Sequence, residues 1–296
     1  MGCELVSIII PCYRQARYLG QAICSALAQT YPHVEVIVVD DGSPDEAAEV
    51  ASRYVGVRLI RQANRGVAAA RNVGLLASGG EYVIFLDADD RLLERGVEVG
   101  VEASRSHPYC AFAWGMCRHI AADGSPVPFR QKPRIEANYY AELLRNNYIR
   151  TPATVIYRRW VFDEVGLFDE SLHGPEDYDL NLRITRRFPV YCHGQTVAEY
   201  RIHTASACHD STRMFAETLA ALRSQWPYVR GHGEHEAAYR EGWRAWCQLF
   251  GNRIMDELLL RRGLKVTARG LGLLFRYYPR GVAYRLCREL HRAMIG

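Results

Sequence analysis

Three short acidic stretches hold most of the chemistry that this sequence offers, at residues 40–41, 87–90 and 176–177. The first two stretches directly follow apolar runs that are typical of buried strands. Their five carboxylates would repel one another unless a cation or hydrogen-bond donors lay among them. Carboxylate oxygens suit Mg²⁺ or Mn²⁺, and Mg²⁺ often takes one or two carboxylates together with substrate phosphates. The pattern therefore predicts a divalent-ion site that binds a nucleotide diphosphate.

The elements that must position these residues alternate between strand and helix over the first 90 residues. The expected strands are Leu5–Ile10, Val34–Val39, Val57–Ile60 and Tyr82–Leu86. The expected helices between them are Ala16–Gln29, Asp45–Tyr54 and Gly66–Leu76. This order indicates an α/β fold, with a mostly parallel, Rossmann-like central sheet flanked by helices. Ligands bind such sheets beyond the carboxyl ends of the strands, where the acidic stretches lie. Pro11 is expected to stop the first strand.

The pattern is less regular after residue 90. The next expected elements are a helix at Leu92–Ser104, a strand at Cys110–Arg118, a loop or hairpin at Ala122–Pro133, a helix at Asn138–Asn146, an extended segment at Ala153–Tyr157, a helix at Asp177–Arg187 and a strand at Tyr191–Ile202. From about Ser211 the pattern is helical, with breaks near Gly231–Gly233, Arg262–Gly263 and Pro279. We expect a catalytic domain at 1–210 and a helical region at 211–296.

Several blocks of this sequence, in this order, resemble the family 2 inverting glycosyltransferases with the GT-A fold. The resemblance covers roughly residues 5–205. The blocks are Val6–Tyr13, Gln29–Pro32, Glu35–Ser43, Asn64–Gly74, Gly80–Asp90 and Gly174–Leu180. It implies a hexosyltransferase that moves a sugar from a nucleoside-diphosphate sugar, with a UDP-sugar favoured, to a hydroxyl acceptor. The acceptor class would be a glycan, a glycolipid or another cell-surface or secondary-metabolite precursor.

The resemblance also implies roles for individual positions. The residues implied for the nucleotide are Pro11, Tyr13, Asp41, Asn64, Arg71, Asp87 and Ala88. Within that set, Asp41 would accept a hydrogen bond from the base and Asp87 would meet the ribose. Asp89 would bind the metal, and His203 approaches the metal or the diphosphate in some relatives. A lone histidine is also often a structural residue, and the alternative for Arg71 is an ion pair on a helix surface. The family often has Asn where Arg14 stands, which leaves the role of Arg14 open.

Inverting transfer needs one carboxylate to take the proton of the acceptor hydroxyl. Glu176 and Asp177 open an expected helix, whose N-terminus favours negative charge. By resemblance Asp177 is the base, and Glu176 is its neighbour or an acceptor contact. Simple helix capping by these acids is the alternative. A pair of carboxylates could also indicate a glycosidase, but that mechanism leaves the nucleotide-like strand ends unexplained.

Other activities fit the sequence less well. A nucleotidyltransferase also binds nucleotides on a related sheet, but it needs a glycine-rich, basic phosphate loop where Pro11–Arg14 stand. A dinucleotide oxidoreductase needs G-x-G-x-x-G in the first strand–helix turn, which is absent. A non-catalytic sugar-binding or scaffold protein remains a third alternative, against which the acidic residues argue.

Charge is distributed unevenly along the 296 residues, of which 49% are apolar and 24% charged. The residues from Arg261 onward include nine Lys or Arg and one acid, for a net charge of +8. Such a basic amphipathic end predicts a membrane surface as a partner, or packing on protein, with a homo-oligomer open and no nucleic acid expected. Nine cysteines without C-x-x-C spacing indicate a reducing compartment and no zinc site. Without a signal-like N-terminus or an apolar span, we expect a cytoplasmic protein, peripheral at the inner face of a membrane.

Overall fold

The computed structural model describes residues 4–129, 135–203, 210–259 and 268–295. The described residues divide into two compact units. The first unit runs to residue 140 and resumes at 147–203. The second contains 141–146 and the described residues from 210 onward. The second unit thus includes residues 141–146, which the expected boundary near residue 210 assigns to the catalytic domain.

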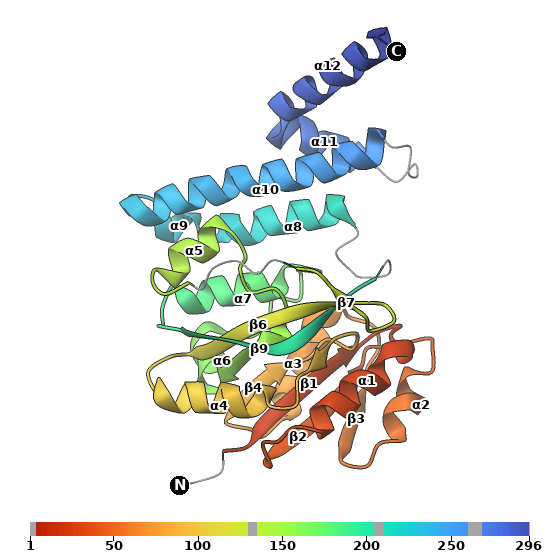
Figure 1. Ribbon diagram of the computed structural model, residues 1–296. Coiled ribbons are helices and arrows are strands. Elements are labelled where there is room, and N and C mark those ends of the chain that lie inside the picture. The colour runs from red at the N-terminus through yellow and green to blue at the C-terminus, as the bar shows by residue number, and fades with distance from the viewer. Residues whose placement is uncertain (1–3, 130–134, 204–209, 260–267, 296) are drawn as a thin grey trace. The chain divides into compact units, whose positions relative to one another are not determined.

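The first unit is built around a nine-stranded sheet with the strand order β3-β2-β1-β4-β8-β6-β9-β5 (Figure 1). Its first four strands in chain order are parallel, and they are β1 (Val6–Cys12), β2 (Val34–Asp40), β3 (Val57–Arg61) and β4 (Tyr82–Phe85). β2 and β4 flank β1, and β3 lies at the sheet edge. This part confirms the parallel series that the alternating pattern predicts.

The other half of the sheet is mixed. β8 (Val155–Arg158) is antiparallel to both β4 and β6 (Phe112–Ala121). β9 (Tyr191–Ile202) is parallel to β6, β5 (Arg91–Leu92) is antiparallel to β9, and β7 (Pro126–Val127) forms a hairpin with β6. Most paired positions of the whole sheet still lie in parallel pairings, as expected for this fold class.

Helices cover both faces of the sheet (Figure 1). One face packs against α1 (Ala16–Leu27), α2 (Ala47–Ser52) and α4 (Gly96–Ser106). The opposite face packs against α3 (Val67–Ala77), α6 (Trp160–Val165) and α7 (Glu176–Thr185). Successive residues of a strand point to opposite faces, so both sides of β1 and β2 must be apolar. Ile8 and Ile10 accordingly lie in the first core, and Ile9 lies in the second.

Three local expectations were wrong, and one helix was not foreseen. Pro11 does not stop β1, which continues to Cys12. The hydrogen bond from Leu86 N to Ile9 O shows that the backbone groups of Ile9 face β4. Those of Pro11, two residues later, face the same side. β4 has ended there, so the missing N–H of Pro11 leaves no acceptor of β4 without a donor. Leu92 lies in β5, and the helix begins at Gly96 because 91–92 pair with β9. Pro152–Thr154 form a 3₁₀ turn before β8, and the sequence pattern did not reveal α6.

The second unit is helical, and its helices are α8 (Ser211–Ser224), α9 (Trp226–Val229), α10 (Gly233–Leu259), α11 (Ala268–Tyr277) and α12 (Pro279–Ile295). Part of α5 (Tyr139–Arg145) belongs to it. A small core around Phe215, Phe250 and Leu274 joins α8, α10 and α11. The predicted breaks at Gly231–Gly233 and Pro279 are confirmed, because α10 and α12 begin there. The predicted break at 262–263 and the loop residues 130–133 lie outside the described residues. None of the described helices is long and apolar enough to cross a membrane.

Candidate active site

The ends of β1, β2 and β4 meet at one edge of the sheet. Cys12 is in register with Asp40, and Ile9 is in register with Phe85 at the end of β4. The chain then leaves each strand at the same edge, through Tyr13, Asp41 and Asp87. The acidic stretches at 40–41 and 87–90 therefore come together at this edge, as the strand order predicts. We call this edge the rim.

Asp41 is almost completely buried and accepts three hydrogen bonds from its own protein. Its Oδ1 accepts from Gln62 Nε2 at 2.7 Å and from the backbone N of Arg65 at 2.9 Å. Its Oδ2 accepts from the backbone N of Gly66 at 2.8 Å. A carboxylate offers about four acceptor positions, so Oδ2 retains capacity for one more donor. Asp41 thus fixes the loop that leads into α3.

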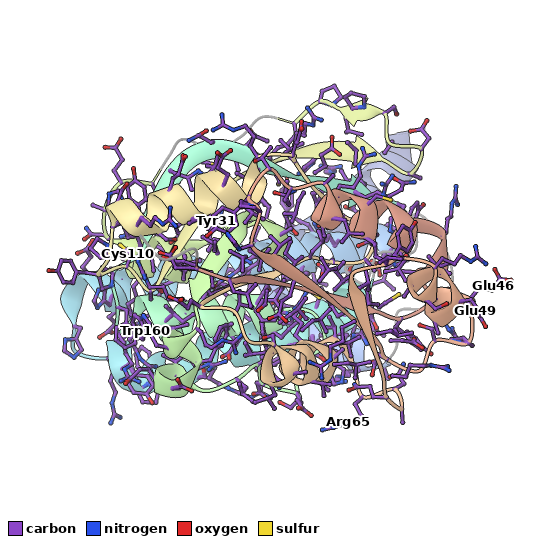
Figure 2. All side chains as sticks on the ribbon, turned by 90° about the horizontal axis from the view of Figure 1, so that it is seen from below. Tyr31, Glu46, Glu49, Arg65, Cys110 and Trp160 are labelled. Atoms are coloured by element: carbon purple, nitrogen blue, oxygen red, sulfur yellow. The ribbon has the colours of Figure 1, made fainter. Side chains whose placement is uncertain are left out.

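That loop places Asn64 at the rim. Gly42 has a left-handed backbone with φ +69°, and a Cβ there would lie 2.9 Å from the backbone N of Asn64. Only glycine allows this close approach without strain. Asn64 itself is exposed, as is Arg65, which extends outward from the surface and pairs with Glu170 at 2.7 Å (Figure 2).

Pro11 is buried and Tyr13 is 40% exposed. Arg14 has a left-handed backbone with φ 56°, which is uncommon outside glycine. Its N donates to Ser43 Oγ at 3.2 Å, and its guanidinium carbon lies 5.2 Å from the centre of the Tyr13 ring. The turn after β1 therefore presents one aromatic ring, flanked by a cation, at the rim.

Arg71 is a buried bridge between two of the acidic stretches. Its Nη2 lies 2.6 Å from Asp87 Oδ1, and its Nη1 lies 2.6 Å from Glu176 Oε1. Burial opposes the charge of Arg71, but the carboxylates of Asp87, Glu176 and Asp177 outweigh it and raise its pKa. The guanidinium of Arg71 offsets the repulsion among these acids. Arg71 does form ion pairs, as the alternative for it supposed, but they are buried and do not lie on a helix surface.

Asp177 is partly exposed in the first turn of α7, next to the Arg71 bridge. Its Oδ1 accepts from the backbone N of Tyr178 at 2.7 Å. Burial, and then the neighbouring carboxylate of Glu176, raise the pKa of Asp177 to about 7, although Arg71 acts in the opposite direction. Glu176 is more buried and is held by Arg71, so Asp177 is the acid of this pair that can accept a proton near neutral pH.

Asp89 and His203 form the third part of the site. His203 Nε2 lies 2.8 Å from Asp89 Oδ2. Burial, and then the charge of Asp87, raise the pKa of Asp89. Ala88 between the two acids is buried and packs into the first core.

Asp90 anchors this segment. The sequence places it among the five rim carboxylates but indicates no separate role for it. Asp90 Oδ1 accepts from the backbone N of Arg201 at 2.9 Å, and Asp90 Oδ2 accepts from Thr151 Oγ1 at 2.7 Å. Arg201 is 1% exposed and donates through Nε to the backbone O of Asp89 at 2.8 Å. A buried arginine on a strand must be paired with acceptors. Arg201 lies two residues before His203, and this position is the signal that could have pointed to its role from the sequence.

The Asp89–His203 pair fits a divalent ion. Two neighbouring ligands in octahedral Mg²⁺ geometry, each about 2.1 Å from the ion, are roughly 3 Å apart, close to the separation seen here. The described residues contain no cluster of three or more His, Cys, Asp or Glu that could hold a metal. Among the described residues, Asp89 and His203 are thus the two candidate ligands.

This combination of a parallel α/β rim, a buried acidic centre and a separate carboxylate near neutral pKa defines a group-transfer enzyme of the nucleotide-binding type. A family model described as glycosyl transferase family 2 matches residues 7–166. The chain belongs to glycosyl transferase family 2, and it is a glycosyltransferase.

Curated relatives support this assignment. The chain is 30% identical over 221 residues to the uncharacterized glycosyltransferase RP339 of Rickettsia prowazekii, covering 72% of this chain and 69% of that protein. It is 32% identical over 197 residues to EpsJ of Bacillus subtilis, an uncharacterized glycosyltransferase, covering 62% of this chain and 56% of that one. It is 31% identical over 231 residues to TuaG of the same organism, a putative teichuronic acid biosynthesis glycosyltransferase, covering 74% and 87%.

Solved structures share the fold. Residues 1–349 of S. aureus TarS in complex with UDP-GlcNAc match with a TM-score of 0.70 at 17% identity, covering 92% of this chain and 80% of that one. The mannosyltransferase PcManGT of Pyrobaculum calidifontis, in complex with GDP-Man and Mn²⁺, matches with a TM-score of 0.63 at 16% identity, covering 96% and 81%. The expected GT-A fold is thereby confirmed.

Proposed function

We propose that the protein is an inverting, metal-dependent hexosyltransferase that transfers a sugar from a nucleoside-diphosphate sugar to a hydroxyl acceptor. A UDP-sugar is the favoured donor. The donor nucleotide would lie along the rim, with its base near Pro11, Tyr13, Asp41 and Asn64, and its ribose near Asp87. The UDP-GlcNAc complex of TarS and the GDP-Man complex of PcManGT, which share this fold, support a donor of this class.

Asp177 is the base of this proposal. Its carboxylate would take the proton of the acceptor hydroxyl, whose oxygen forms a bond to the anomeric carbon. The bond from that carbon to the diphosphate oxygen breaks on the opposite face, so the configuration inverts. The observation that carries this role is the position of Asp177, a partly exposed carboxylate in the first turn of α7 beside the Arg71 bridge. Burial also raises its pKa to about 7, and a general base works best when its pKa is near the working pH.

Arg71 and Glu176 position this base. Without the Arg71 cation, the burial and the carboxylate charges around Asp177 would raise its pKa further and leave it protonated at neutral pH. Glu176 holds Arg71 against the start of α7, which fixes the base relative to the rim. Both are thus positioning residues in this scheme.

Asp89 and His203 would hold Mg²⁺ or Mn²⁺. The ion would supply positive charge to the departing diphosphate, so no acidic side chain is required at the leaving group. Asp90, through Thr151 and Arg201, would keep Asp89 in place for this task.

A pocket beside this segment is the proposed place for part of the acceptor. It encloses about 490 Å³, including its mouth, and its lining includes Trp114, Phe129, Tyr148, Arg150 and Thr154. Thr154 donates to the backbone O of Thr151, whose side chain donates to Asp90. The pocket is therefore connected to the metal-binding segment through two hydrogen bonds. Aromatic walls with one cation suit an acceptor that has an apolar part and a negative charge.

The surface of α11 supports a peripheral membrane location at the cytoplasmic face. Leu271 is 40% exposed and Phe275, one turn later, is 65% exposed. Arg269 and Arg276 are exposed on the same helix. Exposed apolar side chains beside arginines are typical of helices that lie in the headgroup region of anionic lipid.

A screen of UDP-, GDP- and dTDP-sugars with Mn²⁺ tests the proposed function. We expect one donor class to raise the melting temperature and to be hydrolysed slowly with water as the acceptor. Donor binding without hydrolysis or transfer would favour the non-catalytic alternative, and release of pyrophosphate from a nucleoside triphosphate would favour a nucleotidyltransferase.

A further inference from the structure

The second unit contains a groove whose lining consists of arginine and aromatic side chains. We call it the arginine–aromatic groove, and it is lined by Arg223, Trp226, Tyr239, Arg240, Trp243 and Arg244. It encloses about 910 Å³, including its open mouth. α8, α9 and α10 supply these residues, and no carboxylate is among the described residues that line the groove. Four of them are spaced on α10 so that they share one face of that helix.

The positive charge of the groove is only partly balanced. Arg240 pairs with Glu236, through Nε at 3.0 Å and Nη2 at 2.6 Å. Arg223 and Arg244 are exposed, and neither pairs with a carboxylate of the described residues. Guanidinium groups bind carboxylate or phosphate through two parallel hydrogen bonds. The groove therefore offers at least two cations to an anionic ligand.

Three aromatic rings lie in a row along the same groove. The ring centres of Trp226 and Tyr239 are 5.2 Å apart, and those of Tyr239 and Trp243 are 5.9 Å apart. Trp226 and Trp243 are half-buried, so each still presents part of its surface to solvent. Helices hold the rings in place, which lowers the entropic cost of binding a ligand. Such rings bury the apolar faces of ligands that are otherwise polar, as sugar rings are.

We propose that the arginine–aromatic groove binds an anionic carbohydrate, a chain of sugar rings that carry carboxylate or phosphate groups. The inference rests on the proposed function, because it gives the acceptor a second contact on the helical unit. Lipid fits less well, because the part of the lining that the structure describes has no aliphatic side chain. Double-stranded nucleic acid also fits less well, because its affinity for proteins comes largely from neutralised phosphates, and the groove offers only three arginines, one of them already paired.

Calorimetry with defined probes tests this proposal on the full chain. We expect a decamer of galacturonic acid to bind at low salt, and a neutral maltodextrin of equal length to bind at least about tenfold more weakly. Arg223→Glu/Arg244→Glu should weaken binding of the decamer at least about tenfold, since it removes both unpaired cations. Trp243→Ala should weaken it about fivefold and leave binding of inorganic polyphosphate, which has no ring, unchanged.

A matched variant elsewhere in the unit serves as the control. Arg269→Glu/Arg276→Glu makes the same change of charge on α11 and should leave decamer binding intact while weakening binding to vesicles with 30% phosphatidylglycerol. The proposal is overturned if the groove variant and the control variant weaken decamer binding equally. It is also overturned if the groove variant loses vesicle binding but keeps decamer binding, or if single-stranded RNA outcompetes the decamer. Nucleotide binding by the wild-type protein separates this proposal from the proposed function. If the wild type binds the decamer but no nucleotide, only the proposed function is contradicted.

Discussion

The carboxylates at the end of β2 differ from those between β4 and α7 in what balances their charge. Asp40 and Asp41 accept hydrogen bonds from the backbone N–H groups of Ser43, Arg65 and Gly66. Asp40 also pairs with Arg61 at 3.1 Å, but that guanidinium is largely exposed, whereas Arg71 is buried. The acids around Arg71 share one buried guanidinium, and Asp177 has a pKa near 7. The backbone donors around Asp41 hold the loop before α3 in one conformation. The acids that share Arg71 include Asp177, whose raised pKa lets it exchange a proton near neutral pH. In the proposed function, recognition and reaction are thus separated along one rim.

Asp177→Asn should have the largest effect on this comparison. The amide cannot take the acceptor proton, so we expect transfer, or donor hydrolysis by water, to fall about 10²- to 10⁴-fold. Because burial disfavours the ionised carboxylate, the variant should also melt at a higher temperature than the wild type at pH 8. Steady-state rates and thermal melting measure both effects, and an unchanged rate would remove Asp177 as the base.

Arg71→Met should be the most damaging change for stability. It leaves the buried Glu176 and the partly exposed Asp87 without their cation, which we expect to lower the free energy of unfolding by about 3–5 kcal/mol. Urea denaturation measures the loss. Arg65→Ala is the matched control, since its exposed pair with Glu170 should contribute only about 0–1 kcal/mol. Equal losses for the two variants would mean that the Arg71 bridge has no special role.

Asp41→Asn should have an intermediate effect. The amide nitrogen would face one or more N–H donors that now point at a carboxylate oxygen, at a cost of about 1–3 kcal/mol in unfolding free energy. We expect nucleotide binding to weaken with little change in the pH dependence of turnover. A shifted pH profile would show that the two groups of acids are not separate.

The pH dependence should be the mildest effect. The base must be ionised, so kcat should fall about tenfold per pH unit below about 7 and level off above it. The raised pKa of Asp177 makes stability change with pH in the opposite direction to kcat. Asp177 contributes favourably to the free energy of unfolding below the ordinary carboxyl pKa, and this contribution is lost as the pH rises through about 7. Melting temperatures of wild type and Asp177→Asn should therefore diverge as the pH is raised from 5 to 8.

The sequence predicts the rim well and the charge network poorly. Apolar runs fix β1 to β4, and their parallel order brings Asp41 and Asp89 to one edge. Arg71 and Glu176 are 105 positions apart, and no local pattern joins them. β8 and β5 are short, and their antiparallel pairing depends on long-range contacts. The pKa of Asp177 depends on burial and neighbours that only the folded chain supplies.

Calorimetric titration of UDP into Asp177→Asn and Asp89→Asn, at pH 8 with Mn²⁺, tests the separation of recognition and reaction most directly. We expect Asp177→Asn to bind with the wild-type affinity, because its carboxylate takes no part in holding the nucleotide. Asp89→Asn should lose the part of the affinity that EDTA removes from the wild type. Equal loss in both variants, or wild-type binding that EDTA does not change, would contradict this account.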